Sequence, residues 1–351
     1  MSTLAFIVPG ALNRPTGGSR YDRHMVEGLQ AAGLEIDVHS LGGQFPTPDQ
    51  RASQAIDECL TRLDDGQWVL VDGLVLGGSP KAFAAHAQRL HFIALVHHPL
   101  ADETGLTPTR ADALKDSEAL ALTLAQGVIV TSDFTRRRLD QLGLYQQAVH
   151  VVPPGVEPLA LRPARNESML HFLCLGSLIP RKGQDILIDS LNTLKELPWR
   201  ASLVGANDLN PAFANACQAQ INAHRLEQKI TLTGALDDDA LNRLWATTDV
   251  LVLPSRYEGY GMVVTEAIAR GIPVITTDAG ALPDTLPPKA GICVAHNDAV
   301  ALADALASVI TQPDRLHELT QSAVSARTGL NSWSEQVRDF KNAIKAIQTH
   351  G

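Results

Sequence analysis

The sequence predicts an α/β protein made of two doubly wound domains in series. Short apolar runs alternate with longer helical patterns along most of the chain, which is typical of parallel strands linked by helices. The runs are apolar throughout, as expected for strands buried on both faces of a sheet. The alternation breaks near residue 153 and then restarts, and 351 residues is about the length of two ordinary domains.

The first half begins with the apolar run LAFIVPG at residues 4–10, which predicts a buried strand. The pattern from Ser19 to Ala32 predicts a helix that Ser19 caps and Gly33 ends. Helical stretches separate most of the later apolar runs. Those runs predict further strands at residues 35–41, 68–71, 91–96, 127–131 and 149–152.

Prolines concentrate where the pattern breaks, and four of them fall between Pro153 and Pro163. Such a stretch is typical of a linker. We therefore expect a first domain over residues 1–157 and a second over residues 158–330.

The second half repeats the rhythm of the first. Its apolar runs predict strands at residues 170–176, 201–205, 229–233, 249–253, 273–276 and 291–294. Its helical patterns cover residues 182–196, 210–225, 238–247, 262–270 and 299–311. A last amphipathic helix, at residues 332–347, either packs on the second domain or joins the first as part of residues 331–351.

Composition excludes several classes of protein. The chain has 29 lysines and arginines against 38 aspartates and glutamates, a net charge of −9, so a nucleic-acid polymer is not the expected partner. An anionic nucleotide remains compatible with this charge, because one pocket needs only a few local cations. Neither a basic leader nor a run of about 20 apolar residues is found. Four scattered cysteines without a CxxC pair predict neither a zinc cluster nor disulfides, and favour a cytoplasmic protein.

Residues 251–284 carry the clearest chemical pattern, in which a strand leads through a glycine-rich loop into a helix. Gly259 and Gly261 lack a Cβ, so a ligand can approach the backbone closely. The first helical amides, near Met262 and Val263, have no partner within the helix and lie at the positive end of its dipole. This start of a helix therefore suits a diphosphate.

Two glutamates flank that start of the helix, Glu258 in the loop and Glu266 in the second helical turn. Glu258 can accept hydrogen bonds from sugar hydroxyls, and Glu266 can take both hydroxyls of a ribose. As a lone pair, the two would be read as a turn residue and a solvated helix residue. Bracketed by glycines in a strand, loop and helix, they predict a sugar-nucleotide site.

The stretch PSRYEGYGMVVTEAIARGIPVI, residues 254–275, resembles the E-x7-E segment of retaining glycosyltransferases of the family-4 type. The resemblance implies the GT-B fold, with two Rossmann-like domains facing each other across a cleft. It also implies metal-independent transfer of a hexose from a nucleotide sugar, with retention of configuration. Further segments resemble this family in the same order, at residues 15–19, 131–139, 151–158, 175–191 and 233–255.

On the donor side, the resemblance places Glu258 against the sugar and Glu266 on the ribose. It assigns Lys182 to the diphosphate. The backbone expected to meet the sugar and phosphates belongs to Gly259, Tyr260, Gly261, Met262 and Val263.

A second family cation is missing, because Ser177 stands where many members have arginine. Arg181 is a candidate replacement, although adjacent side chains such as those of Arg181 and Lys182 ordinarily point in different directions. In the first domain, Gly17 and Gly18 resemble the loop that closes on the donor phosphates; a plain turn is the alternative.

The acceptor side is assigned in the first domain. His97 resembles a family histidine near the reacting sugar, whereas its neighbour His98 has no assigned role. Glu103 and Ser132 are candidates for contact with the acceptor, which is a sugar, a lipid or a small molecule. For each of these residues the alternative is an ordinary structural role.

Neither a metal nor a cofactor is expected, because the nucleotide sugar is itself a substrate. The aspartates at residues 237–239 precede a helix and are read as a cap and not as a metal site. The arginines at residues 136–138 leave open a contact with acidic lipids, but such a row is more often a solvated helix face.

Two alternatives to transfer stay open, a sugar-nucleotide epimerase on the same fold and a non-catalytic nucleotide-sugar binding protein. A phosphorylase lacks a lysine in a suitable context, and a dinucleotide dehydrogenase lacks the G-x-G-x-x-G spacing after the first strand. The donor base and sugar, the acceptor and the oligomeric state are not readable from the sequence.

Overall fold

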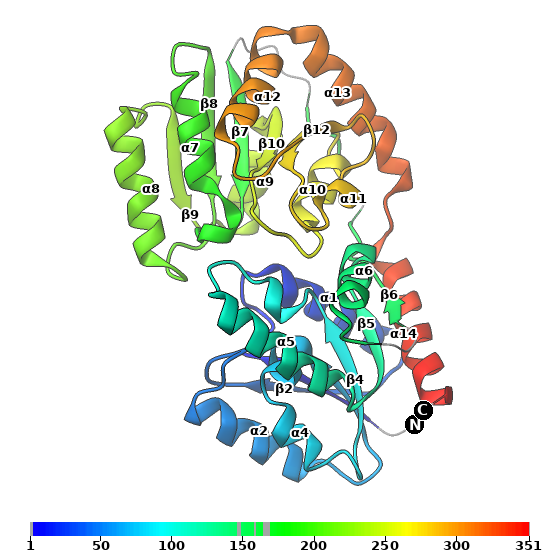
Figure 1. Ribbon diagram of the computed structural model, residues 1–351. Helices are drawn as coiled ribbons and strands as arrows, with labels where there is room; N and C mark the ends of the chain where they lie inside the picture. Colours follow the sequence, from blue (N-terminus) through cyan, green and yellow to red (C-terminus); the bar gives the residue numbers. More distant parts are fainter. Residues whose placement is uncertain (1–2, 146–148, 158, 164–168, 351) are drawn as a thin grey trace. The chain divides into compact units, whose positions relative to one another are not determined.

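The computed structural model describes residues 3–145, 149–157, 159–163 and 169–350. The chain forms two compact units, the first from Met1–Gly155 with Asn331–Gly351 and the second from Val156–Leu330 (Figure 1). The division falls two residues before the boundary expected from the sequence. Within the expected linker, Pro158 and residues 164–168 lie outside the described residues.

The sheet of the first unit is parallel, with the strand order β2-β1-β3-β4-β5-β6. Each strand was expected from its apolar run. Their bounds are β1 (Leu4–Pro9), β2 (Ile36–Leu41), β3 (Trp68–Asp72), β4 (His91–Val96), β5 (Ala125–Val130) and β6 (Val149–Val151).

Helices cover both faces of this sheet. Val69 and Val71 of β3 belong to the core under most of the helices, whereas α1 and α14 pack together at the other face. The helices are α1 (Gly17–Ala31), α2 (Gln50–Arg62), α3 (Gly73–Gly78), α4 (Pro80–Ala84), α5 (Pro108–Leu122), α6 (Asp133–Leu142) and α14 (Trp333–His350), with a 3-10 turn η1 (Leu100–Asp102).

The start of α1 differs from the expectation. Thr16 is the N-cap, and its Oγ1 accepts a hydrogen bond from the Ser19 amide at 3.3 Å. Ser19 is therefore not the cap, and Gly17 and Gly18 form the first helical turn instead of a loop. Serine and threonine are both favoured N-cap residues, so the sequence alone does not distinguish Thr16 from Ser19, and the prediction of Ser19 was wrong.

The second unit has its own parallel sheet, with the order β12-β11-β10-β7-β8-β9. Counted within the unit, this is the order 3-2-1-4-5-6 of a Rossmann fold. Its strands are β7 (Leu170–Leu175), β8 (Trp199–Val204), β9 (Ile230–Gly234), β10 (Val250–Leu253), β11 (Val274–Thr277) and β12 (Gly291–Val294).

Successive residues of these strands pack into two different hydrophobic cores, one on each face of the sheet. Phe172 of β7 packs in the core with α7, α8 and α12, and the next residue, Leu173, packs in the core with α9, α10 and α11. The helices are α7 (Gln184–Asn192), α8 (Pro211–His224), α9 (Asp238–Thr247), α10 (Met262–Ala269), α11 (Leu282–Thr285), α12 (Ala299–Thr311) and α13 (Pro313–Ala326), with 3-10 turns η2 (Pro180–Lys182) and η3 (Arg327–Gly329).

The last helix, α14, packs on the first unit, which is one of the two arrangements that the sequence left open. The contact is close, because a Cβ on Gly28 of α1 would lie 2.3 Å from a methyl group of Val337. A Cβ on Gly127 of β5 would lie 2.4 Å from Ile347. Glycine is thus required where α14 meets α1 and β5.

Each sheet has one point where its winding reverses, between β1 and β3 in the first unit and between β7 and β10 in the second. Ligands of such sheets bind beyond the carboxyl ends of the strands at this point. Among the residues that the structure describes, no helix has the length and apolar character needed to cross a bilayer.

Candidate functional site

In the second unit, predicted donor-site residues meet where the winding reverses. Beyond the carboxyl end of β7 the chain forms η2, which carries Arg181 and Lys182. Beyond the end of β10 it forms a loop that carries Ser255 and Glu258. The topology therefore brings residues more than 70 positions apart to one edge of the sheet.

Glu258 is the centre of this cluster and is almost fully buried. Its Oε1 accepts hydrogen bonds from Nζ of Lys182 at 2.5 Å and from Oγ of Ser255 at 2.7 Å. Its Oε2 lies 3.6 Å from Nη1 of Arg181. The two adjacent basic side chains thus reach the same carboxylate, because η2 turns tightly between them.

The charge of Glu258 follows from these contacts. Burial alone would raise its pKa, but Lys182 and Arg181 outweigh burial and hold the pKa below its ordinary value. The side chain is therefore an anion at neutral pH, able to accept hydrogen bonds but not to donate a proton.

Close backbone contacts fix the Glu258 loop. A Cβ on Gly280, which has φ +62°, would lie 2.2 Å from the carbonyl oxygen of Glu258. The same oxygen accepts a hydrogen bond from the Ala281 amide at 2.9 Å. On the other side, a Cβ on Gly183 would lie 2.1 Å from the carbonyl oxygen of Pro254. Gly183, with φ +69°, also explains why α7 starts at residue 184 and not at 182.

The loop enters α10 through Gly261, which has φ +93° and no side chain that could cap the helix. The first amides of α10, those of Met262 and Val263, have no partner within the helix. Glu266 follows in the second turn, as expected. Tyr260 precedes the helix, and burial raises the pKa of its phenol to about 12.

Arg256 and Asp185 are residues of this site that the sequence analysis missed. The Arg256 guanidinium donates to both carboxylate oxygens of Asp185, at 2.9 and 2.7 Å, and to the carbonyl oxygen of Pro180 at 2.5 Å. It thereby ties the Glu258 loop to the turn that holds Lys182. Arg256 lies inside the quoted motif, but its partner is 71 residues away.

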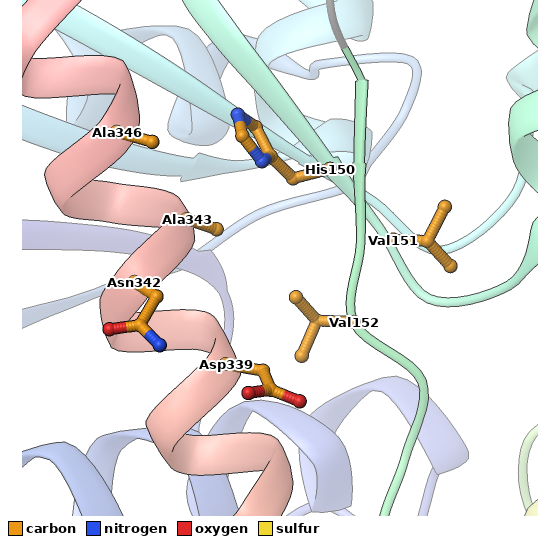
Figure 2. A pocket seen from close by; sticks show the side chains of 7 residues that line it. All are labelled: His150, Val151, Val152, Asp339, Asn342, Ala343 and Ala346. Carbon is orange, nitrogen blue, oxygen red and sulfur yellow. The ribbon is translucent and has the colours of Figure 1, made fainter.

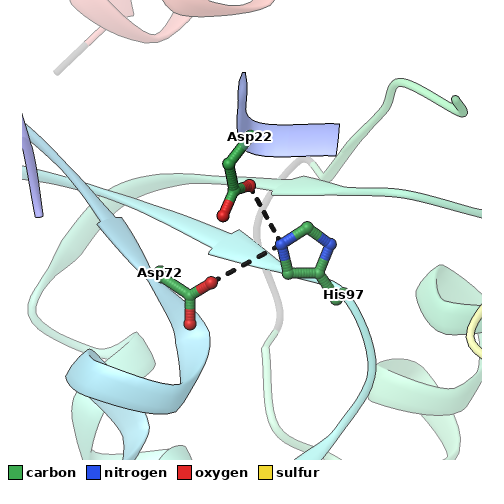
Figure 3. Close-up of side chains that lie close together, drawn as sticks. All are labelled: Asp22, Asp72 and His97. Carbon is green, nitrogen blue, oxygen red and sulfur yellow. Dashed lines mark hydrogen bonds and ion pairs between the residues drawn. The ribbon is translucent and has the colours of Figure 1, made fainter. Parts of the chain in front are cut away.

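The first unit contains a second cluster, centred on His97 at the end of β4 (Figure 3). Nε2 of His97 lies 3.1 Å from Oδ1 of Asp22 and 3.5 Å from Oδ2 of Asp72. Asp22 comes from α1 and Asp72 from the last position of β3. Neither aspartate was predicted as a site residue, although Asp72 directly follows a predicted strand.

The cluster has a defined charge. Burial alone would lower the pKa of His97, but Asp22 and Asp72 raise it to about 10. Burial raises the pKa of Asp22 to about 6, although His97 opposes this. One oxygen of each aspartate and one ring nitrogen of His97 lie within 4.8 Å of one another, a spacing at which the three could also bind a divalent cation. A cation would need a deprotonated Nε2, so the raised pKa of His97 favours the ion pair.

Of the other residues predicted in the first unit, Gly18 lies beside the His97 ring, and His98, Glu103 and Ser132 have contacts of their own. A Cβ on Gly18 would touch the His97 ring at 3.5 Å, whereas one on Gly17 would meet nothing within 4 Å. Nε2 of His98 lies 3.5 Å from Oε2 of Glu103, so the neighbouring histidines have different partners. Ser132 caps α6, accepting from the Thr135 amide at 2.9 Å.

One residue in each of the two charged rows has defined contacts. Oδ1 of Asp237 accepts from the Ala240 amide at 2.7 Å, which confirms that it caps α9. Arg138 makes two 2.8 Å hydrogen bonds to Asp102 and ties α6 to η1. Its guanidinium is therefore held by a carboxylate of the same unit.

A cavity of about 330 Å³ lies in the first unit (Figure 2). It is open to solvent and lies between α14 and residues 150–152 at the end of β6. Its lining residues are His150, Val151, Val152, Asp339, Asn342, Ala343 and Ala346.

Comparison with known families finds one match in the second unit. Residues 162–325 match the family described as "Glycosyl transferases group 1". This range contains Lys182, Glu258 and Glu266.

Curated relatives cover part of the chain. Mannosylfructose-phosphate synthase of Agrobacterium fabrum is 29% identical over 161 residues, which are 41% of this chain and 36% of the relative. A GDP-mannose-dependent alpha-(1-6)-phosphatidylinositol monomannoside mannosyltransferase of Mycobacterium tuberculosis is 31% identical over 210 residues, 54% of this chain and 53% of the relative. The chain thus matches about a third to a half of the length of these relatives.

Among solved structures, sucrose-phosphate synthase from Thermosynechococcus elongatus aligns over 100% of both chains. The TM-score is 0.85 at 19% sequence identity, a likeness that concerns the fold. The two Rossmann-like units of this chain therefore form the α/β architecture of its structural neighbours.

Proposed function

This chain is a member of the glycosyl transferases group 1 family through residues 162–325, and from that premise we propose that it transfers a hexose from a nucleotide sugar to an acceptor hydroxyl. The observation that carries the proposal is the cation cluster of the second unit. Lys182 and Arg181 converge on the buried carboxylate of Glu258, beside the uncapped first turn of α10.

The donor diphosphate suits this arrangement. Two fixed cations and the first amides of α10 stabilise negative charge, which grows on the diphosphate as it leaves. Arg181 supplies a cation on the side where Ser177 offers none. In this proposal Glu266 binds the ribose, and Glu258 accepts hydrogen bonds from the donor sugar while it holds Lys182 in place.

We propose a front-face reaction with retention of configuration and without a metal. The bond from the anomeric carbon to the phosphate oxygen breaks, and a bond to the acceptor oxygen forms on the same face. The acceptor proton passes to the leaving phosphate oxygen. Among the described residues near the cation cluster, none is an evident nucleophile, because Glu258 is already held by Lys182 and Ser255.

The acceptor is proposed to meet residues of the first unit, with His97 near the reacting sugar and Glu103 on acceptor hydroxyls. The relatives include a mannosylfructose-phosphate synthase and a phosphatidylinositol monomannoside mannosyltransferase. GDP-mannose is named for one relative, so it is the first donor to test.

Binding and turnover measurements on two variants test the donor site. Lys182→Ala should lower kcat/KM by about 100-fold or more, since a fixed cation stabilises the leaving diphosphate. Glu266→Ala should raise the Kd of the nucleoside diphosphate about tenfold, through loss of charge-assisted hydrogen bonds. Lys195→Ala, which removes an exposed lysine of the same unit, is the matched control and should change neither value.

Wild-type levels of transfer and donor affinity in both site variants would refute the site. Product analysis separates the remaining functions. An epimerase would release nucleoside diphosphate without a second sugar acceptor, and a binding protein would bind the donor without turnover. A hexosyltransferase forms a product whose mass is that of acceptor plus hexose less water.

A further inference from the structure

The buried aspartates beside His97 have no role in the donor chemistry above, yet both point at one ring nitrogen. Asp22 and Asp72 have side chains only 3% and 4% exposed, whereas the His97 side chain is 19% exposed. Two buried carboxylates around one nitrogen are costly unless a charged partner stabilises them. The positive charge of a protonated His97 ring would therefore stabilise both buried carboxylates.

Each aspartate comes from a rigid element. Asp22 lies on α1, and Asp72 ends β3 and caps α3 through its Oδ1, which accepts from the Leu74 amide at 2.7 Å. Its other oxygen, Oδ2, is the one that faces His97. The ring is also held edge-on by Tyr21, with centroids 5.5 Å apart. The geometry around His97 is thus fixed from two sides.

The backbone of His97 is held as well. Its carbonyl oxygen accepts hydrogen bonds from the hydroxyls of Thr131 and Thr135, each at 3.2 Å. The second ring nitrogen, Nδ1, lies on the side of the ring away from both carboxylates (Figure 3). Whatever meets Nδ1 meets a group whose position and protonation are set by Asp22 and Asp72.

We propose that Asp22 and Asp72 are positioning residues that keep the His97 ring doubly protonated. Their carboxylates hold the proton on Nε2 and balance the positive charge of the ring, so that Nδ1 also carries an N–H and donates it to a hydroxyl oxygen of a bound sugar. A neutral ring with its proton on Nε2 would present Nδ1 as an acceptor instead. The aspartates therefore decide which kind of hydrogen bond the site offers. The identity of the partner as a sugar rests on the proposed function.

The charged groups around the ring agree with this role. Among the described residues, Asp22 and Asp72 are the carboxylates paired with His97, and they raise its pKa to about 10. Because the pKa of His97 is raised, its ring stays positively charged from acid to neutral pH. The charge is lost only as the pH approaches that pKa. Removing one carboxylate should bring this loss into the neutral range.

Nuclear magnetic resonance of protein labelled with ¹⁵N-histidine tests the charge state directly. In the wild type the His97 signals, identified by their absence in His97→Gln, should report a protonated ring up to about pH 9. In Asp22→Asn and in Asp72→Asn the pKa should fall by about 1 to 3 pH units. Asp72→Asn keeps an oxygen for the Leu74 amide, so it preserves the cap of α3.

Transfer kinetics supply the second readout. Both variants should be near wild type at about pH 6.5. Their kcat/KM should fall about tenfold by one pH unit above the His97 pKa that the titration gives for each variant, because the charged donor N–H is lost. Asp49→Asn removes the N-cap carboxylate of α2 in the same unit and should leave the pH profile unchanged. A purely structural defect would lower the rate equally at every pH.

The proposal is wrong if His97 titrates alike in the wild type and both variants, or if the variants lose activity without pH dependence. It is also wrong if Mg²⁺ or Mn²⁺ shifts the Nε2 signal of the wild type, since the cluster would then be a cation site. Failure of the wild type to transfer any hexose would refute the proposed function instead, and the titration of His97 can be read without turnover.

Discussion

Glycine at position 280 is required by the space beside Glu258 rather than by the turn alone. Its φ of +62° is unfavourable for other residues, and a Cβ there would lie 2.2 Å from the Glu258 carbonyl oxygen. Gly234 has a similar φ of +71°, but a Cβ there would meet nothing within 4 Å. The two positions therefore separate backbone strain from displacement of the Glu258 loop.

Gly280→Ala should destabilise the second unit by clearly more than the roughly 1 kcal/mol expected for Gly234→Ala, whose cost is backbone strain alone. It should also weaken binding of a nucleoside diphosphate, because Glu258 must move. Urea unfolding and calorimetric titration measure the two effects. Equal losses in both variants would show that the contact with Glu258 has no energetic consequence.

At the scale of single residues, the resemblance singled out Lys182 and Glu258 from two separate motifs, and the structure places them 2.5 Å apart. The resemblance gave no such guide to the partners of His97. Asp22 and Asp72 stand 75 and 25 residues before His97, and no local spacing links them. Only the sheet order makes them neighbours.

The turn that carries Lys182 and the loop that carries Glu258 act as one element because Arg256 and Asp185 join them. Two hydrogen bonds in parallel are stronger than one, and both side chains are partly shielded from water. A double-mutant cycle with Arg256→Ala and Asp185→Ala should give a coupling of about 1 to 3 kcal/mol in stability.

The exposed pair formed by Arg62 and Glu58 on α2 is the matched comparison. Nη2 of Arg62 lies 3.4 Å from Oε2 of Glu58, and the two residues are one helical turn apart on the exposed face of α2. The coupling energy of this pair should therefore be about 0.3 to 0.5 kcal/mol. If the Arg256 cycle gives no more than this surface pair, the two segments are not clamped. Weaker nucleoside diphosphate binding in Arg256→Ala would link the clamp to the site.

Elements were predicted better than their ends. All strands of the two described sheets were expected, because burial on both faces leaves continuous apolar runs. The starts of α1 and α7 were misplaced, since Thr16 competes with Ser19 as a cap and Gly183 delays the helix. Such choices depend on which hydrogen bonds the folded backbone completes, and composition does not reveal them.

At the scale of the whole chain, α14 makes the first unit discontinuous in sequence. Gly28→Ala should lower the Tm of the first unit, because the new methyl group would lie 2.3 Å from a methyl group of Val337. Val337→Ala alone removes buried apolar surface and should also destabilise it, by about 1 to 3 kcal/mol.

The double variant tests whether the two changes compensate. Gly28→Ala with Val337→Ala should be more stable than the sum of the single losses predicts, since the second change removes the overlap. Scanning calorimetry that resolves the two units measures this. Strict additivity would mean that the two helices separate freely at this contact.

The pattern of residues 332–347 predicted an amphipathic helix but not its partner. An apolar stripe indicates that one face of the helix is buried, but it does not indicate which domain the helix packs against. The glycines at positions 28 and 127 identify the partner in the structure, because each leaves room for a branched side chain of α14. Neither glycine is distinguishable in sequence from one that serves a turn.

The order of the two units along the chain determines when each can be completed during synthesis on the ribosome. The second unit, Val156–Leu330, is one uninterrupted stretch and leaves the exit tunnel before α14 does. Most of the first unit is translated earlier, but its surface around Tyr21 and Gly127 stays uncovered until Trp333–His350 emerges. The part of the protein that is made first is therefore the last to be finished, and its nascent form is the one that chaperones would shield.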